Sequence, residues 1–114
     1  MPYFEVQTST AVAQETFPEL YHELARIMEL VPGKSEKWVM VHLEDQAKMS
    51  FGGNADEPAA CIVVKTFGEL EDQQYTMLTG ELCNSMSKIL GVSPERLYVT
   101  YEGIRHWGWN GSNF

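Results

Sequence analysis

The sequence has few cysteines and few basic residues. Its 114 residues include only two cysteines, Cys61 and Cys83, which are too few and too badly placed for the disulfide framework of a small secreted domain. We expect both to lie in the core as small apolar side chains. Eight basic residues stand against sixteen acidic ones, for a net charge of −8. This balance argues against binding to nucleic acid or to an anionic membrane, because both require a basic face.

The sequence also lacks a long apolar run. No stretch is long and apolar enough for a transmembrane helix, and residues 1–12 alternate too much to form the apolar part of a signal peptide. We therefore expect no membrane contact and a cytosolic location, with leaderless secretion as the alternative. The length predicts one domain, residues 1–114, and a hydrophobic content of 44% predicts a modest core.

The motifs of several common enzyme classes are missing as well. None of the three histidines, His22, His42 and His106, stands at metal-ligand spacing from a cysteine or a carboxylate. The glycines of Phe51–Asn54 lack the following helix and lysine of a phosphate-binding loop, so we interpret them as a plain turn. There is no nucleophile elbow. The sequence therefore predicts no metal site and no phosphate loop.

One reactive group is present at the start of the chain. Pro2 follows Met1, and we expect aminopeptidases to remove Met1, which would leave Pro2 with a free secondary amine. Such an amine titrates near neutrality, and burial in an apolar pocket would lower its pKa further. A base of this kind is suited to proton transfer at carbon. Taken alone, Pro2 has the simpler interpretation of an accident of where the chain starts.

The two halves of the sequence partly match each other without a gap. The matching pairs are Val6 with Val64, Thr8 with Thr66, Leu24 with Leu82, Met28 with Met86, Gly33 with Gly91, and Val41 with Val99, among others. Each half predicts a strand, a helix, a Gly-x-Ser turn and a second strand. The predicted strands span residues 3–8, 38–44, 59–67 and 97–101, and the helical stripes run from Phe17 to Met28 and from Tyr75 to Ile89.

Two β-α-β units predict an α/β (α+β) fold, with one four-stranded sheet and both helices on one face. A right-handed crossover makes the two strands within each unit parallel. The other face of the sheet is left without a helix, although residues 59–64 and 97–101 carry apolar side chains in both directions. Because a sheet that is apolar on both faces is usually buried on both, we expect a closed homo-oligomer.

Several short fragments, in their order along the chain, make it resemble the macrophage migration inhibitory factor family of the tautomerase superfamily. They are Met1-Pro2, Gly33-Lys34, Met49-Ser50-Phe51-Gly52-Gly53, Glu57-Pro58, Phe67-Gly68, Ser93-Pro94-Glu95-Arg96-Leu97-Tyr98 and Trp109-Asn110-Gly111-Ser112-Asn113-Phe114. The fold that this resemblance implies is the same pair of β-α-β repeats, assembled as a homotrimer with active sites between subunits.

The activity that the resemblance implies is keto–enol tautomerisation. The implied substrates are small aromatic α-keto acids such as phenylpyruvate and hydroxyphenylpyruvate, and dopachrome derivatives. No metal or cofactor is required. Animal members of the family suggest an alternative, a cytokine-like interaction protein that binds a receptor protein and keeps only weak tautomerase activity. A third reading is a relative that dehalogenates or decarboxylates small acids, but Arg26 and Arg96 are predicted to be structural and only Arg105 lies near the candidate pocket.

The resemblance also implies roles for individual residues. Pro2 matches the catalytic base, Lys34 the cation that holds the substrate's negative group, and Tyr98 a pocket tyrosine donated by a neighbouring subunit. Phe67 stands where the family uses a backbone N–H and C=O. The apolar walls would come from Tyr3, Trp38, Trp107 and Trp109.

Some positions depart from the family pattern or leave two interpretations open. Thr100 stands where the animal proteins have an asparagine that contacts the carboxylate, so substrate binding would be reshaped. Ala59 and Ile62 replace the two cysteines of the animal Cys-x-x-Cys, which removes a thiol oxidoreductase activity through that motif. From the residues alone, the aromatic cluster that ends in Phe114 either packs under the C-terminal tail or walls an apolar pocket.

Overall fold

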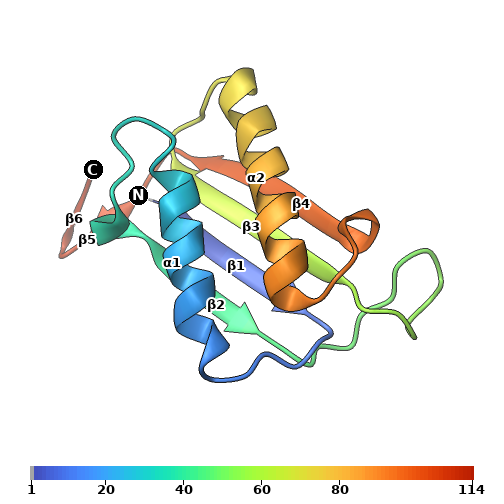
Figure 1. Cartoon of the computed structure of the whole chain (residues 1–114). Helices are drawn as coiled ribbons and strands as arrows, with labels where there is room; N and C mark the ends of the chain where they lie inside the picture. The colour runs from blue at the N-terminus through green and yellow to red at the C-terminus, as the bar shows by residue number, and fades with distance from the viewer. Residues whose placement is uncertain (1) are drawn as a thin grey trace.

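The computed structural model describes residues 2–114, so the prediction that Met1 is removed lies outside the described residues. In chain order the elements are β1 (Pro2–Thr8), α1 (Thr16–Met28), the short 3₁₀ turn η1 (Glu36–Trp38), β2 (Met40–Glu44), β3 (Ala60–Phe67), α2 (Asp72–Leu90), the 3₁₀ turn η2 (Pro94–Arg96), β4 (Leu97–Ile104), β5 (Gly108–Trp109) and β6 (Ser112–Asn113). Both long helices lie on one face of the main sheet (Figure 1).

The main sheet has the strand order β2-β1-β3-β4. β1 and β2 are parallel, as are β3 and β4, because α1 and α2 carry the chain back across the sheet within each half. The two halves meet at the central β1–β3 pair, which is antiparallel. This arrangement confirms the predicted pair of β-α-β units, the four-stranded sheet and the helices on one face.

The core fills the space between the helices and the sheet. In β1 the alternate residues Phe4 and Val6 are buried, as the period-two pattern predicts. Leu24 of α1 and Leu82 of α2 are fully buried against them. Gly91 ends α2 with a φ of 69°, a left-handed conformation that favours glycine.

The boundaries of β2 and β4 differ by two residues or more from the predicted ones. α1 ends at Met28, where the predicted helical stripe also ends. Trp38 belongs to η1 and not to β2, because the Ser35 hydroxyl accepts a 3.3 Å hydrogen bond from the Lys37 N–H and starts a tight turn there. β4 continues beyond Tyr101 to Ile104, since Phe67 of β3 still provides a pairing partner at that position.

The face of the sheet without helices is less apolar than predicted. Cys61 and Val63 are half-buried on it, but Glu5 and Lys65 form an ion pair of 3.2 Å on the same face. The prediction that both cysteines lie in the core was wrong for Cys61, which is half-buried on the face without helices. Cys83 packs at the edge of the core from α2, and burial raises the pKa of both thiols. In residues 2–114 no helix is both long and apolar enough to cross a membrane.

Candidate active site

A cavity of about 320 Å³ lies at the amino end of β1. It is lined by Pro2, Tyr3, Lys37, Trp38, Val39, Met40, Trp107, Gly108 and Trp109. Three separate segments therefore meet here: the start of β1, the passage from η1 into β2, and the C-terminal β5–β6 hairpin, which folds back beside the N-terminus (Figure 1). Pro2 itself is buried. The structure thus brings together five of the predicted site residues, Pro2, Tyr3, Trp38, Trp107 and Trp109.

The wall of this cavity is a cluster of aromatic rings. The Trp38 ring meets the Trp109 ring edge to face, with centroids 4.9 Å apart. The Phe114 ring lies 5.8 Å from Trp38 and 6.0 Å from Trp109. The Phe114 N–H donates a 3.0 Å hydrogen bond to the Trp107 carbonyl, which fixes the end of the chain. Trp109 both packs against Phe114 and lines the cavity, so both interpretations hold for this residue, whereas Phe114 packs the tail and is not among the lining residues of the described chain.

Phe67 joins the cluster from the end of β3. Its ring centroid lies 6.0 Å from that of Phe114. Phe67 is not one of the residues that line the cavity in the described chain, so its side chain supports the aromatic wall from behind. The Gly68 N–H that follows it donates a 2.8 Å hydrogen bond to the Ile104 carbonyl and ties the ends of β3 and β4 together.

The cation at the cavity is a residue that the sequence analysis did not consider. Lys34 lies half-buried in the turn after α1, where its N–H donates to the Val31 carbonyl at 3.2 Å, and within residues 2–114 it does not line the cavity. Lys37 does line it, with its Nζ 5.0 Å from the centre of the Trp38 ring. The sequence could have indicated Lys37, because it directly precedes Trp38, a residue predicted to line the site. The cavity therefore has an ammonium group above its aromatic wall.

Tyr98 and Thr100 lie elsewhere on the same chain. Pro2 pairs with Thr66 near the end of β3, whereas Tyr98 pairs with Cys61 near its beginning. At about 3.3 Å per residue this separation exceeds about 16 Å along the sheet. Tyr98 is also 62% exposed. Thr100 pairs with Val63, nearer the middle of β3, and neither Tyr98 nor Thr100 lines the Pro2 cavity in the part of the chain that the structure describes.

The family model described as macrophage migration inhibitory factor (MIF) matches residues 1–114. The chain belongs to this family. Among curated relatives, the macrophage migration inhibitory factor of Meriones unguiculatus is 32% identical over 119 residues, covering 100% of this chain and 99% of that protein. That of Xenopus laevis is 29% identical with the same coverage. The chain spans nearly the whole length of both relatives.

Solved structures of the MIF family have the same fold. The crystal structure of Leishmania major MIF2 matches with a TM-score of 0.93 at 32% sequence identity, covering 100% of this chain and 97% of that one. The MIF homologue of Prochlorococcus marinus matches with a TM-score of 0.82 at 31% identity, covering 98% of each chain. Membership of the family supports a tautomerase or cytokine type of function.

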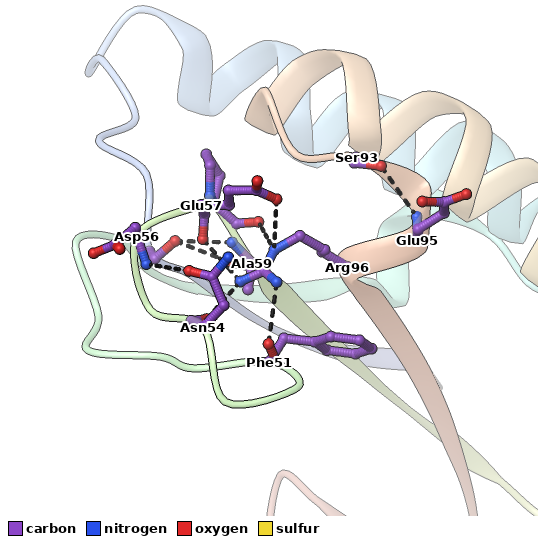
Figure 2. Close-up of polar contacts among 10 residues, drawn as sticks. Phe51, Asn54, Asp56, Glu57, Ala59, Ser93, Glu95 and Arg96 are labelled. Carbon is purple, nitrogen blue, oxygen red and sulfur yellow. Dashed lines mark hydrogen bonds and ion pairs between the residues drawn. The ribbon is translucent and has the colours of Figure 1, made fainter.

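Two of the three arginines of this MIF-family chain, Arg26 and Arg96, have structural partners. Arg26 on α1 forms ion pairs with Glu23 and with Glu81 of α2. The hydrogen bonds to Glu23 raise the pKa of the Arg26 guanidinium, and the same contact lowers the pKa of the Glu23 carboxyl. Arg96 is bound to backbone carbonyls of the loop before β3 (Figure 2). Both were predicted to be structural, and these contacts agree. Arg105 is exposed just after β4.

A larger cavity lies at the other end of β1. It has a volume of about 740 Å³ and is lined by Ser9, Thr10, Ala47–Ser50 and Ala55–Pro58. It contains none of the residues predicted for the site. Within residues 2–114 no group of three or more His, Cys, Asp or Glu side chains could hold a metal ion. We therefore take the smaller cavity around Pro2 as the candidate active site.

Proposed function

We propose that this protein is a keto–enol tautomerase of small aromatic α-keto acids, with Pro2 as its base. The observation that carries the proposal is the burial of Pro2 in a cavity with three tryptophans, Trp38, Trp107 and Trp109, on its lining. Apolar surroundings disfavour the charged form of an amine, so a chain that begins at Pro2 would hold it neutral. The flat indole walls suit an aromatic substrate.

The proposed reaction moves one proton and leaves no other change. The neutral Pro2 amine takes a proton from the carbon next to the ketone, and the electrons of the broken C–H bond move to the ketone oxygen as an enolate forms. The protonated amine then gives a proton to that oxygen, which completes the enol and restores the base. The reverse sequence converts enol to ketone. The chemistry needs no redox partner.

Two lysines are candidates to bind the substrate's carboxylate: Lys37, which lines the cavity, and Lys34, which the family resemblance implies. We expect Lys37→Gln and Lys34→Gln each to raise KM for phenylpyruvate several-fold, roughly 3- to 10-fold, with little change in kcat, because a uniform binding contact is lost. Lys88→Gln, in the exposed last turn of α2, is the matched control and should leave KM unchanged. Steady-state kinetics at fixed ionic strength measures all three. Unchanged KM in both Lys37→Gln and Lys34→Gln would exclude an ammonium contact from these lysines.

The proposal includes assembly into a homotrimer. Neither Tyr98 nor Thr100 lines the Pro2 cavity within residues 2–114, so in the proposed trimer both would serve the site of a neighbouring subunit. The cytosol, with leaderless secretion as the alternative, stays the proposed location. Sedimentation velocity at roughly micromolar concentration, far above a stable trimer's dissociation constant, should show the mass of three chains. A monomer would contradict the assembly.

The direct test combines mass and turnover. Intact mass first establishes which fraction of the sample begins at Pro2, and the same sample is then given phenylpyruvate enol while its ultraviolet absorbance is followed. We expect catalysed ketonisation whose kcat/KM falls as the pH is lowered through the pKa of the amine, because the protonated amine has no lone pair. A fully trimmed sample that does not catalyse the reaction would contradict the proposal. The cytokine-like interaction protein would then be the better reading.

A further inference from the structure

A nearly buried arginine holds the loop of residues 51–58. The Arg96 side chain is only 11% exposed. Its guanidinium donates hydrogen bonds to four backbone carbonyls: those of Phe51 at 3.1 Å, Asn54 at 2.8 Å, Glu57 at 3.0 Å and Pro58 at 2.9 Å. Figure 2 shows these contacts converging on the one side chain. A carboxylate oxygen of Glu57 lies farther away, 3.9 Å from Nε.

Only an arginine can make this set of contacts. The guanidinium has five N–H donors fixed in a plane, whereas a lysine ammonium has three on one atom. Its position is set by η2, in which the Ser93 hydroxyl accepts from the Glu95 N–H at 3.3 Å. An Arg96→Lys substitution would therefore leave carbonyls of the loop without partners while keeping the positive charge.

The loop that Arg96 holds is itself well defined at its tip. Phe51 and Asn54 exchange two backbone hydrogen bonds, of 3.0 and 3.1 Å. Between them Gly52 and Gly53 have φ values of 60° and 79°, the left-handed pair that a two-residue hairpin turn requires. The turn thus fixes where the Phe51 side chain leaves the backbone.

The contacts continue from Phe51 to Tyr98. One side of the Phe51 ring faces the Arg96 guanidinium, whose central carbon lies 5.5 Å from the ring centroid. The Phe51 ring also packs against the Tyr98 ring, with centroids 5.0 Å apart. Tyr98 is otherwise exposed, at the end of the sheet opposite its own Pro2. Phe51 is therefore the support that orients an exposed phenol.

We propose that Arg96 is a positioning residue for Tyr98. By fixing the Phe51 carbonyl and ring, it holds the phenol in one orientation before that phenol enters the Pro2 cavity of a second copy of this chain. The inference rests on the proposed function, in which Tyr98 serves a neighbouring subunit. Arg96 touches no substrate. Its effect on turnover passes through Phe51 and Tyr98 alone.

A double-mutant cycle tests this route. We expect Arg96→Lys to lower kcat/KM about 10-fold in the wild-type background, because a misplaced contact group weakens transition-state binding. The Tyr98→Phe background lacks the phenol hydroxyl. In that background Arg96→Lys should lower kcat/KM by less than about 2-fold, because the two residues act as one unit. The matched control Arg26→Lys, on an exposed ion pair, should have no effect in either background. Equal losses in both backgrounds would overturn the proposal.

A second measurement does not depend on activity. With 3-fluorotyrosine placed at position 98, the ¹⁹F resonance should shift or broaden in Arg96→Lys and in Phe51→Leu, and stay unchanged in Arg26→Lys. Phe51→Leu leaves the four carbonyl contacts of Arg96 in place. This variant therefore still tests whether the Phe51 ring orients Tyr98, even if Arg96→Lys does not fold. A Tyr98 resonance that is unchanged in the folded variants overturns the positioning role. An inactive wild type with the expected ¹⁹F change overturns only the proposed function.

Discussion

Converting the Pro2 nitrogen into an amide should abolish turnover of phenylpyruvate. A chain extended by Met-Lys before Pro2 keeps every described side chain but removes the basic lone pair. We expect kcat/KM to fall by about 10³-fold, within the range by which a positioned base accelerates proton transfer. Pro2→Gly, trimmed so that Gly is the first residue, keeps an amine but loses the ring that is buried at the cavity. The kcat/KM of Pro2→Gly should fall less than that of the extended chain, by about 10²-fold.

A second proline provides the control for these variants. Pro18 is exposed in the first turn of α1, where a backbone N–H would have no partner within the helix. Pro18→Ala should therefore leave both turnover and fold unchanged. Intact mass establishes the first residue of each sample, and circular dichroism establishes its folding. Full turnover by the extended chain would show that another group is the base.

The largest loss of stability is expected from Leu82→Ala. Leu82 of α2 is fully buried between the helices and the sheet. Truncation removes its apolar contacts and leaves a cavity that the packed neighbours fill only in part. We expect the free energy of unfolding to fall by about 3 kcal/mol. Urea denaturation at one fixed protein concentration measures this, since any assembly makes stability depend on concentration.

The matched control is Leu30, an exposed leucine. Leu30 is 42% exposed, just beyond α1, so Leu30→Ala removes little buried surface. Its free energy of unfolding should stay within about 0.5 kcal/mol of the wild type. Comparable losses in the two variants would mean that Leu82 does not lie in the cooperative core.

The fold could be predicted because its signal is periodic and repeated. The stripe from Phe17 to Met28 has helical spacing, and the strand pattern of β1 alternates. The match between the two halves then predicted the same unit twice. The ends of the elements were harder to predict. Trp38 lies in a turn because the Ser35 hydroxyl accepts a hydrogen bond from the Lys37 N–H, and such a local contact leaves no periodic pattern in the sequence.

The candidate site could be predicted only in part. Pro2 was named from its place after Met1 and Trp109 from the family resemblance, and both line the cavity. The resemblance implied Lys34 as the cation, whereas Lys37 of η1 lines the cavity and Lys34 lies in the turn before η1. The distance of Tyr98 from Pro2 follows from strand register, which short motifs do not encode.

The sequence by itself determined the two β-α-β units, the acidic charge balance and the presence of a proline able to carry a free amine. Only the tertiary structure decided what surrounds that proline. The antiparallel β1–β3 pairing and the returning β5–β6 hairpin bring Trp38 and Trp109 together around Pro2. Contacts between residues so far apart depend on how whole elements pack, and periodicity within one segment carries no information about them.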